Sequence, residues 1–237
     1  YEIASCLVGS EMCIRDRIKS PGRICFFGDH QDYLGLPVIS GTIDRYVYIK
    51  ASKIESSFFE INLLDFNESL KIEFKNDPKK IAPSDYFRAG LYVLEKNGII
   101  PNQGYQIQIN GDLPINAGLS SSSSLVVGWI KFLVKAFAVG RKIDNLQIAK
   151  WAVETEVDFF NQAGGIMDQY TISIGGLMMI DTSKKTYEKL EGSLGPLLVI
   201  DSGESKNTQG VLSNAKVNAQ EAIKPVSYTH LTLPTKA

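Results

Sequence analysis

The apolar run from Leu125 to Val139 constrains the fold more than any other stretch of this chain. It follows directly on a run of serines, 120–124, and its only charged residues are Lys131 and Lys135. The run is shorter than the roughly 18 apolar residues that a membrane span needs. A helix that is apolar on nearly every side belongs in a protein interior. We therefore expect a globular core built around a buried helix.

The composition narrows the class of protein. The 237 residues are 44% apolar and 22% charged, as in ordinary globular domains. Lys and Arg number 25 against 26 Asp and Glu, so the net charge is −1. This balance predicts neither a nucleic-acid partner nor a membrane partner, and it leaves the oligomeric state open. Glu2, Glu11 and Asp16 interrupt any signal-peptide pattern, so we expect a cytoplasmic protein with reduced thiols.

The two ends of the chain differ in pattern from their neighbours. Residues 1–17 (YEIASCLVGSEMCIRDR) and 225–237 resemble translated sequencing-adapter read-through more than native sequence. Segments of this kind are not expected to belong to the native fold, so we expect a single domain over residues 18–224. We expect the native protein to continue beyond this domain at its C-terminus.

Alternation and turn residues indicate an α+β fold with a mixed, largely antiparallel sheet packed by helices. Asp144 and Gln147 have the spacing of a helix capping box. Ser84 is expected to cap an earlier helix that ends near Gly98. The expected strands are 24–27, 38–49, 59–63, 70–74, 105–109, 177–180 and 197–200, and the expected helices are 84–98, 125–139, 144–160 and 208–223.

The segment PGRICFFGDHQDYLG, residues 21–35, is the first candidate site. A strand that ends at Gly28 delivers Asp29, His30, Asp32 and Tyr33 into one turn. Carboxylates and an imidazole held in a loop can hydrogen-bond several hydroxyls, which suits a polyol such as a sugar. The alternative is a polar turn with an exposed histidine.

The segment DLPINAGLSSSSSLVVGW, residues 112–129, is the second. Gly118 allows close approach of the backbone to a ligand, and the serines lead straight into the apolar helix. Amide groups at a helix N-terminus favour an anion such as phosphate, and a serine hydroxyl can bind Mg²⁺. A flexible serine linker is the alternative. Neither GxxxxGK[ST] nor a GxGxxG after a strand occurs, so the sequence supports neither a Walker loop nor a dinucleotide fold.

The segment AGGIMDQY, residues 163–170, is the third. We expect its glycines to end a helix and to place Asp168 in the loop beyond, with Glu156 twelve residues earlier. Two carboxylates could divide the work, one binding a metal and the other meeting a substrate hydroxyl. An ordinary glycine turn is the alternative.

Together the three segments resemble the motifs of a known family. PGRICFFGDHQDYLG, LPINAGLSSSSSL and GGIMDQY, in this order, are similar to the first two signature motifs and the catalytic-Asp segment of the galactokinase branch of the GHMP small-molecule kinases. The resemblance covers about residues 18–224. It implies a GHMP-kinase N-terminal domain, with most of the C-terminal domain missing, and the transfer of phosphate from ATP, with Mg²⁺, to a sugar hydroxyl.

The resemblance also implies a role for individual residues. Arg23 would stabilise the transferring phosphoryl group and hold Asp168, which would accept the proton of the attacking hydroxyl. Phosphoryl transfer needs mainly positioning and charge neutralisation, which this set would supply. The remaining roles are sugar binding by Asp29, His30, Gln31 and Asp32, contact with the ATP phosphates by Asn116, Ala117, Gly118, Leu119, Ser120, Ser121 and Ser122, and Mg²⁺ binding by Ser122 and Glu156.

Some positions depart from the family pattern. Asp29 stands where the family has Glu, Cys25 where it has Asn, and Asn116 where it has Gly. The family's third, glycine-rich motif is absent, so we expect this chain alone to be inactive. Two alternatives stay open: a GHMP kinase for another alcohol, mevalonate-like or a sugar acid, and a catalytically silent sensor that binds sugar and ATP.

Overall fold

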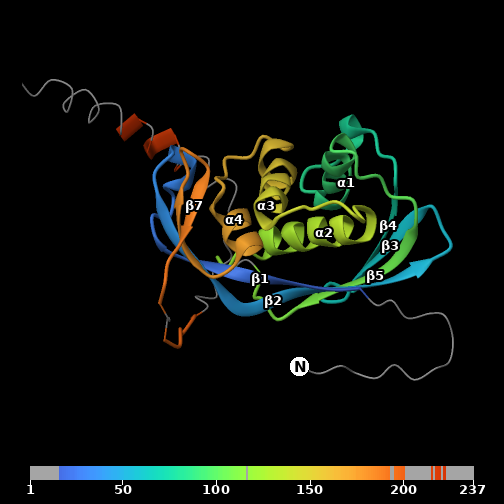
Figure 1. Ribbon diagram of the computed structural model, residues 1–237, viewed down its shortest axis with the longest axis horizontal. Helices are drawn as coiled ribbons and strands as arrows, with labels where there is room; N and C mark the ends of the chain where they lie inside the picture. Colours follow the sequence, from blue (N-terminus) through green and yellow to red (C-terminus); the bar gives the residue numbers. More distant parts are fainter. Residues whose placement is uncertain are drawn as a thin grey trace, which may run out of the picture.

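The computed structural model describes residues 16–115, 117–192 and 195–200, together with the helical positions 215, 217–219 and 221–222. In this part of the chain one mixed seven-stranded sheet carries its helices on one face (Figure 1). The strands are β1 (Asp16–Phe27), β2 (Val38–Ile54), β3 (Phe58–Leu63), β4 (Glu68–Glu73), β5 (Gly104–Gly111), β6 (Leu177–Asp181) and β7 (Thr186–Lys189). The helices are α1 (Tyr86–Lys96), α2 (Ser121–Phe137), α3 (Asn145–Val153) and α4 (Met167–Ile174), with 3₁₀ turns η1 (Asp32–Leu34) and η2 (Pro78–Lys80) and a π-helical turn η3 (Glu154–Asp158).

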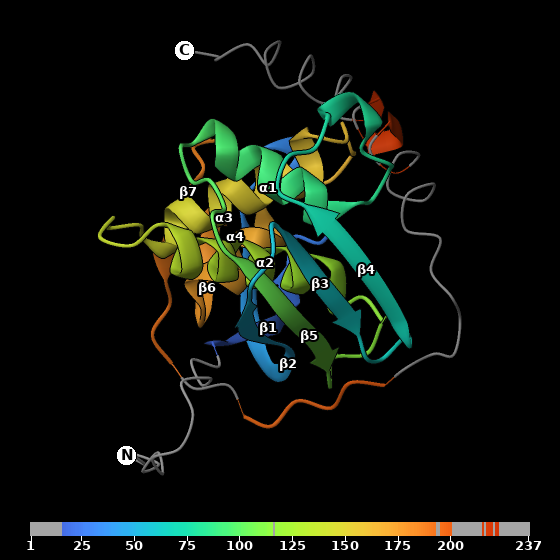
Figure 2. The same ribbon diagram turned by 90° about the vertical axis from the view of Figure 1, so that its right-hand side faces the viewer.

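The long strand β2 organises the sheet. Antiparallel β1 runs along one side of it, while β5 and β6 pair with its C-terminal and N-terminal parts on the other side. The sheet then extends through β3 and β4 at one edge, seen side by side with β5 in Figure 2, and through β7 at the other. Only the β3–β5 pair is parallel among the described strands. The expected mixed, largely antiparallel sheet is confirmed.

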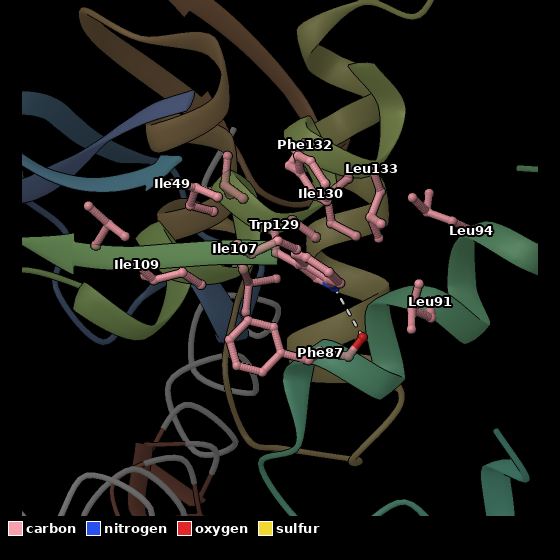
Figure 3. Packing of buried hydrophobic residues seen from close by; sticks show 14 of the residues in the cluster. Ile49, Phe87, Leu91, Leu94, Ile107, Ile109, Trp129, Ile130, Phe132 and Leu133 are labelled. Carbon is pink, nitrogen blue, oxygen red and sulfur yellow. Dashed lines mark hydrogen bonds between the residues drawn. The ribbon is translucent and has the colours of Figure 1, made fainter. Parts of the chain in front are cut away.

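The core forms where α2 packs on the sheet. Helix α2 contacts β1 and β2 and is flanked by α1, α3 and α4. Trp129 and Phe132 are fully buried at its centre, and the Trp129 indole donates a 3.0 Å hydrogen bond to the carbonyl of Phe87 on α1 (Figure 3). The buried aromatic partner Phe59 approaches Trp129 edge-on at 5.6 Å. This confirms the buried helix that the apolar run predicted.

Several expected boundaries need correction. Helix α1 is capped by Asp85, whose carboxylate accepts from the Arg88 amide, and not by Ser84. The apolar run 197–200 was expected as a strand, but the structure describes it without one. Helix α4 and strand β7 were not predicted. The capping of α3 is confirmed, because the Asp144 carboxylate accepts from the Gln147 amide at 2.7 Å.

The ends of the chain lie mostly outside the described residues. Residues 1–15 and 223–237 are outside, as is most of the helix expected over 208–223, although its described positions are helical. Asp16 and Arg17 begin β1, where they pair with Ala51 and Lys50. Among the described helices, none has both the length and the apolar character to cross a lipid bilayer.

Candidate active site

The three predicted segments meet around one cavity of about 640 Å³. Its walls are the end of β1 with the loop after it, the N-terminus of α2, and the loop that leads into α4. The π-helical turn η3 contributes the side chain of Glu156. Segments separated by more than a hundred residues are thus brought together by the packing of α2 and α4 on β1.

Arg23 links two of these walls. The register of β1 shifts between Pro21 and Arg23, and such bulges re-aim side chains beside functional sites. The Arg23 Nε donates to Asp168 Oδ1 at 2.6 Å, and its Nη1 donates to the Gly118 carbonyl at 3.0 Å. Its backbone amide also donates to the Leu119 carbonyl at 3.2 Å. Burial lowers the pKa of Arg23, but the charge and hydrogen bond of Asp168, together with the charge of Asp29, more than offset this, so a fixed cation lines the cavity.

The sequence predicted that Asp168 lies in a loop after the glycines at 164 and 165. The structure instead places Asp168 in the first turn of α4. Its second carboxylate oxygen, Oδ2, accepts from the Ser120 hydroxyl at 2.6 Å. Burial would raise the pKa of Asp168, but the charge and hydrogen bond of Arg23 and the hydroxyls of Ser120 and Ser123 bring it below its ordinary value. This carboxylate is therefore ionised and held in one orientation.

The serine run forms the N-terminus of α2. The first amides of a helix have no partner inside it and present partial positive charge, which favours an anion. Ser120 is the N-cap residue, with φ of 60°, and its side chain bonds Asp168 instead of capping the helix. Gly118, Leu119, Ser120, Ser121 and Ser122 all line the cavity. Ala117 packs against the core and does not line it, and Asn116 lies outside the described residues.

The loop after β1 supplies a second group of polar side chains. Asp29, His30 and Asp32 line the cavity, and the Asp29 side chain is 67% exposed. His30 has φ of 61°, in the left-handed region where a side chain other than glycine is strained. Gln31 is exposed and does not line the described cavity, and its role in sugar binding stays a prediction.

Asp32 connects this loop to the one before α4. Its carboxylate accepts from the amide of Tyr33 at 3.0 Å and from that of Met167 at 3.4 Å. The carboxylate occupies the space that a Cβ atom would take at Gly165, which explains glycine at that position. Burial and the nearby charge of Asp168 raise the pKa of Asp32.

Glu156 is buried on the π-helical turn, with 6% of its surface exposed. Its Oε2 accepts from Gln169 Nε2 at 2.7 Å, and the hydroxyls of Ser122 and Ser123 also bond this carboxylate. Burial raises its pKa. The structure thus brings together Ser122 and Glu156, the pair expected to hold a metal.

The oxygen atoms of this part of the cavity suit a cation that is bound partly by the protein and partly by the phosphates of a nucleotide. In the described part, no three His, Cys, Asp or Glu side chains form a cluster that could hold a metal ion. Mg²⁺ in phosphate-transferring sites usually takes one or two carboxylates, with phosphates and water completing its shell. Glu156 with a serine hydroxyl meets that requirement, and the Gln169 Oε1 nearby is a buried acceptor to which no described group donates.

Other residues of the cavity were missed from the sequence. Ser123 is 2% exposed and bonds both carboxylates, yet it is one serine among five in the run. Gln169 could have been predicted, because it comes directly after Asp168 in the sequence. Cys25, noted from the sequence only as a departure from the family pattern, and Gln162, which no spacing pattern identifies, also line the cavity.

The arrangement suits the transfer of a phosphoryl group to a hydroxyl. A fixed cation, Arg23, and a helix N-terminus can neutralise phosphate charge, while an ionised carboxylate, Asp168, can accept a proton. Preorganised groups of this kind are strongest in a site that excludes water. The polar loop with Asp29 and Asp32 faces the same space and can bind a polyhydroxylated acceptor.

Comparisons with known proteins agree with this geometry. Residues 85–176 match the GHMP kinases N terminal domain, and residues 16–53 match the galactokinase galactose-binding signature. The galactokinase of Pyrococcus furiosus is 34% identical over 174 residues, which cover 72% of this chain and 48% of that protein. The galactokinase of Levilactobacillus brevis is 28% identical over 86% of this chain and 53% of that protein. The chain spans about half the length of the curated relatives it matches.

Solved structures have the same fold. The structure of Lactococcus lactis galactokinase complexed with galactose aligns with a TM-score of 0.75 at 22% identity, over 94% of this chain and 59% of that one. The mevalonate kinase of Methanococcus jannaschii aligns with a TM-score of 0.62 at 27% identity, over 75% of this chain and 56% of that one. These similarities confirm the expected fold class.

Proposed function

Because this chain belongs to the GHMP kinases, on their galactokinase side, we propose that its protein phosphorylates a sugar hydroxyl with ATP. One observation carries the proposal. Arg23, Asp168 and the serine N-terminus of α2 are joined by short hydrogen bonds at a cavity whose other wall bears Asp29, His30 and Asp32. Galactose is the sugar we propose, because the galactose-binding signature spans that wall.

In this proposal each group of the site has a defined role. Asp168 accepts the proton of the attacking hydroxyl, whose oxygen forms a bond to the γ-phosphorus while the bond to the bridging oxygen breaks and ADP leaves. Arg23 keeps Asp168 ionised and oriented, and it neutralises charge that develops on the transferring group. Asp29, His30 and Asp32 hold the other sugar hydroxyls, so that the reacting hydroxyl is positioned for attack.

The nucleotide and the cation complete the proposed site. The first turn of α2, with Gly118 and Leu119 before it, is the proposed cradle for the ATP phosphates. Ser122 and Glu156 would hold Mg²⁺. A bound Mg²⁺ would neutralise charge on the phosphates.

A second acceptor is worth testing, because the Methanococcus jannaschii mevalonate kinase aligns at 27% identity. A mevalonate-like acceptor would bring its own carboxylate into the cavity, where Asp29 and Asp32 would repel it. The local charge of this wall therefore favours an uncharged polyol over a carboxylic acid.

Calorimetric titration of the chain tests the acceptor. We expect galactose to bind more tightly than glucose or mevalonate, and Asp32→Asn to weaken the binding of galactose. Asp158→Asn is the control, because it removes a carboxylate from a residue that the cavity wall does not include. Binding of mevalonate in preference to every sugar would replace the proposed acceptor. Absence of sugar binding would overturn the proposal.

Two wider assignments belong to the same proposal. The GHMP domain would occupy residues 18–224, with 1–17 and 225–237 as non-native tails. The enzyme would act in the cytoplasm, with ATP as the phosphate donor.

The pairing of Asp16 and Arg17 within β1 favours trimming the chain at residue 16 and not at 18. Chemical unfolding of a 16–224 chain should give the same midpoint as the 237-residue chain, and a clear decrease would show that the ends contribute to the fold.

A further inference from the structure

Gln169 is a buried polar side chain of the cavity wall that the proposed mechanism does not use. It is 3% exposed, lies in the first turn of α4 and comes directly after Asp168. Met167, two residues before it, and Tyr170, directly after it, are apolar core residues. A position of this kind favours an apolar side chain unless the amide has a task.

The amide of Gln169 has a defined orientation. Its Nε2 donates to Glu156 Oε2 at 2.7 Å. A carboxylate cannot donate to an amide oxygen, so the nitrogen must face Glu156 and the oxygen Oε1 must point away from it. That oxygen is buried, and no group in the described part of the chain donates to it.

A buried acceptor without a donor is uncommon in folded proteins and calls for a partner. Gln169, Glu156 and Ser122 line the same cavity, and the Ser122 hydroxyl bonds the same carboxylate as Gln169. The missing partner must therefore be a donor that enters beside the proposed cation site. Water bound to a divalent cation is such a donor, since Mg²⁺ keeps several waters in its shell.

We propose that Gln169 is a positioning residue for the cation: its Nε2 fixes the Glu156 carboxylate, and its Oε1 accepts a hydrogen bond from a water on the metal. This inference rests on the proposed function, because it takes Glu156 as a ligand. Outer groups that orient a metal ligand commonly change metal affinity 10–100-fold when they are removed. The placement of Gln169 next to Asp168 also means that one turn of α4 carries both the proposed base and the support of the metal ligand.

The test measures Mn²⁺ binding and not turnover. Mn²⁺ is titrated into the chain saturated with AMP-PNP, and free Mn²⁺ is followed by electron paramagnetic resonance. Gln169→Met, which keeps the length of the side chain without its hydrogen bonds, should weaken Mn²⁺ binding about 10–100-fold. AMP-PNP affinity in EDTA, measured by calorimetry, should stay within about twofold of the wild type, because Gln169 is assigned no contact with the nucleotide.

Gln162→Met is the matched control. Gln162 lines the same cavity, but its Nε2 donates to Tyr86 Oη at 3.4 Å and not to Glu156. This variant should bind Mn²⁺ like the wild type. Gln169→Asn is a second variant, whose amide is one methylene too short to maintain both contacts, and it decides the question if the Met variant does not fold.

The outcomes separate the two proposals. If the wild type with AMP-PNP binds no more Mn²⁺ than AMP-PNP alone, the proposed function fails. If the wild type binds and Glu156→Gln weakens binding, while a folded Gln169 variant binds like the wild type, the role of Gln169 is refuted and the proposed function stands. Equal weakening by the Gln162 and Gln169 variants would also refute it, because the effect would then be general to the cavity wall.

Discussion

Asp168 combines two properties that rarely occur in one carboxylate, since it is largely enclosed and yet has a lowered pKa. Replacement by Asn removes the charge that would accept a proton but keeps the shape. In the catalytically active protein, Asp168→Asn should reduce turnover by about 10²–10⁴-fold, with nucleotide affinity nearly unchanged. Steady-state ADP release with the cognate sugar and calorimetry with AMP-PNP are the measurements. Turnover like that of the wild type would remove Asp168 from the mechanism.

Asp32 shows the opposite electrostatics, because burial and the charge of Asp168 raise its pKa. A raised pKa in the folded state means that ionised Asp32 destabilises the protein once the pH exceeds the ordinary aspartate value of about 4. The free energy of unfolding of Asp32→Asn, relative to the wild type, should therefore increase as the pH rises from below that value through the raised pKa. The same variant should bind sugar more weakly.

Urea unfolding at several pH values measures this difference. Asp29→Asn, in an exposed part of the same loop, is the control for removing a carboxylate near the cavity. A difference between Asp32→Asn and the wild type that does not change with pH would contradict the prediction. The expected result is that the stability of Asp32→Asn relative to the wild type rises with pH while its sugar binding is weaker, a trade-off that is common where active sites hold unfavourable charges.

Helices α1 and α2 approach closely at Gly90, which faces Trp129. A Cβ atom at Gly90 would lie 2.8 Å from Trp129 Cδ1, too close for a fully buried indole that is fixed by its hydrogen bond to Phe87. Gly90→Ala should therefore destabilise the fold by about 1–3 kcal/mol from overpacking. This exceeds the gain of about 1 kcal/mol that Ala normally brings to a helix interior.

Chemical denaturation followed by tryptophan fluorescence tests the prediction, with Gly128→Ala as the matched variant. Its Cβ would lie 3.2 Å from Ile49 Cδ1, so a smaller effect is expected. A Gly90→Ala protein as stable as the wild type would show that α1 can move away from α2 without loss.

The elements predicted correctly from the sequence are those whose own residues carry the signal. The apolar run of α2 and the capping box of α3 are local features, and both predicted their helices. Helix α4 has no such signal, because its N-cap is Ile166, which has no side chain that can accept from the helix. Strand β7 is exposed at all four positions and forms only through its pairing with β6, so alternation could not identify it.

The candidate site likewise contains residues that could be identified from the sequence and contacts that could not. Arg23, Asp168, Ser120 and Ser122 were identified because their segments resemble motifs of the GHMP kinases, and the structure brings them to one cavity. The roles assigned to them stay predictions. The contact between Gln169 and Glu156 depends on how α4 packs against the π-helical turn, and no local pattern encodes it.

At the scale of the whole molecule, the proposed phosphate cradle is continuous with the buried core, because both belong to helix α2. Helix α2 begins at the cavity and continues through the core of Figure 3, where Trp129, Ile130 and Phe132 are fully buried. Amide exchange in such a segment requires global unfolding, whereas an exposed edge strand opens locally. The amides of 126–133 should exchange most slowly, and those of β7 among the fastest of the described strands.

Hydrogen–deuterium exchange with mass spectrometry checks this order. Addition of AMP-PNP should slow exchange at the first turn of α2, because ligand binding suppresses local opening. Protection of β7 equal to that of α2 would contradict the expected distribution of stability.

The π-helical turn has a consequence for the ancestry of Glu156. The amide of Phe159 bonds the carbonyl of Glu154, five residues back, where an α-helix bonds four residues back. This turn thus holds one residue more than a regular helix would, and the extra residue rotates the subsequent side chains by about 100° around the helix axis. An acidic side chain at this site can therefore be gained or lost through a single-codon insertion or deletion as well as by substitution.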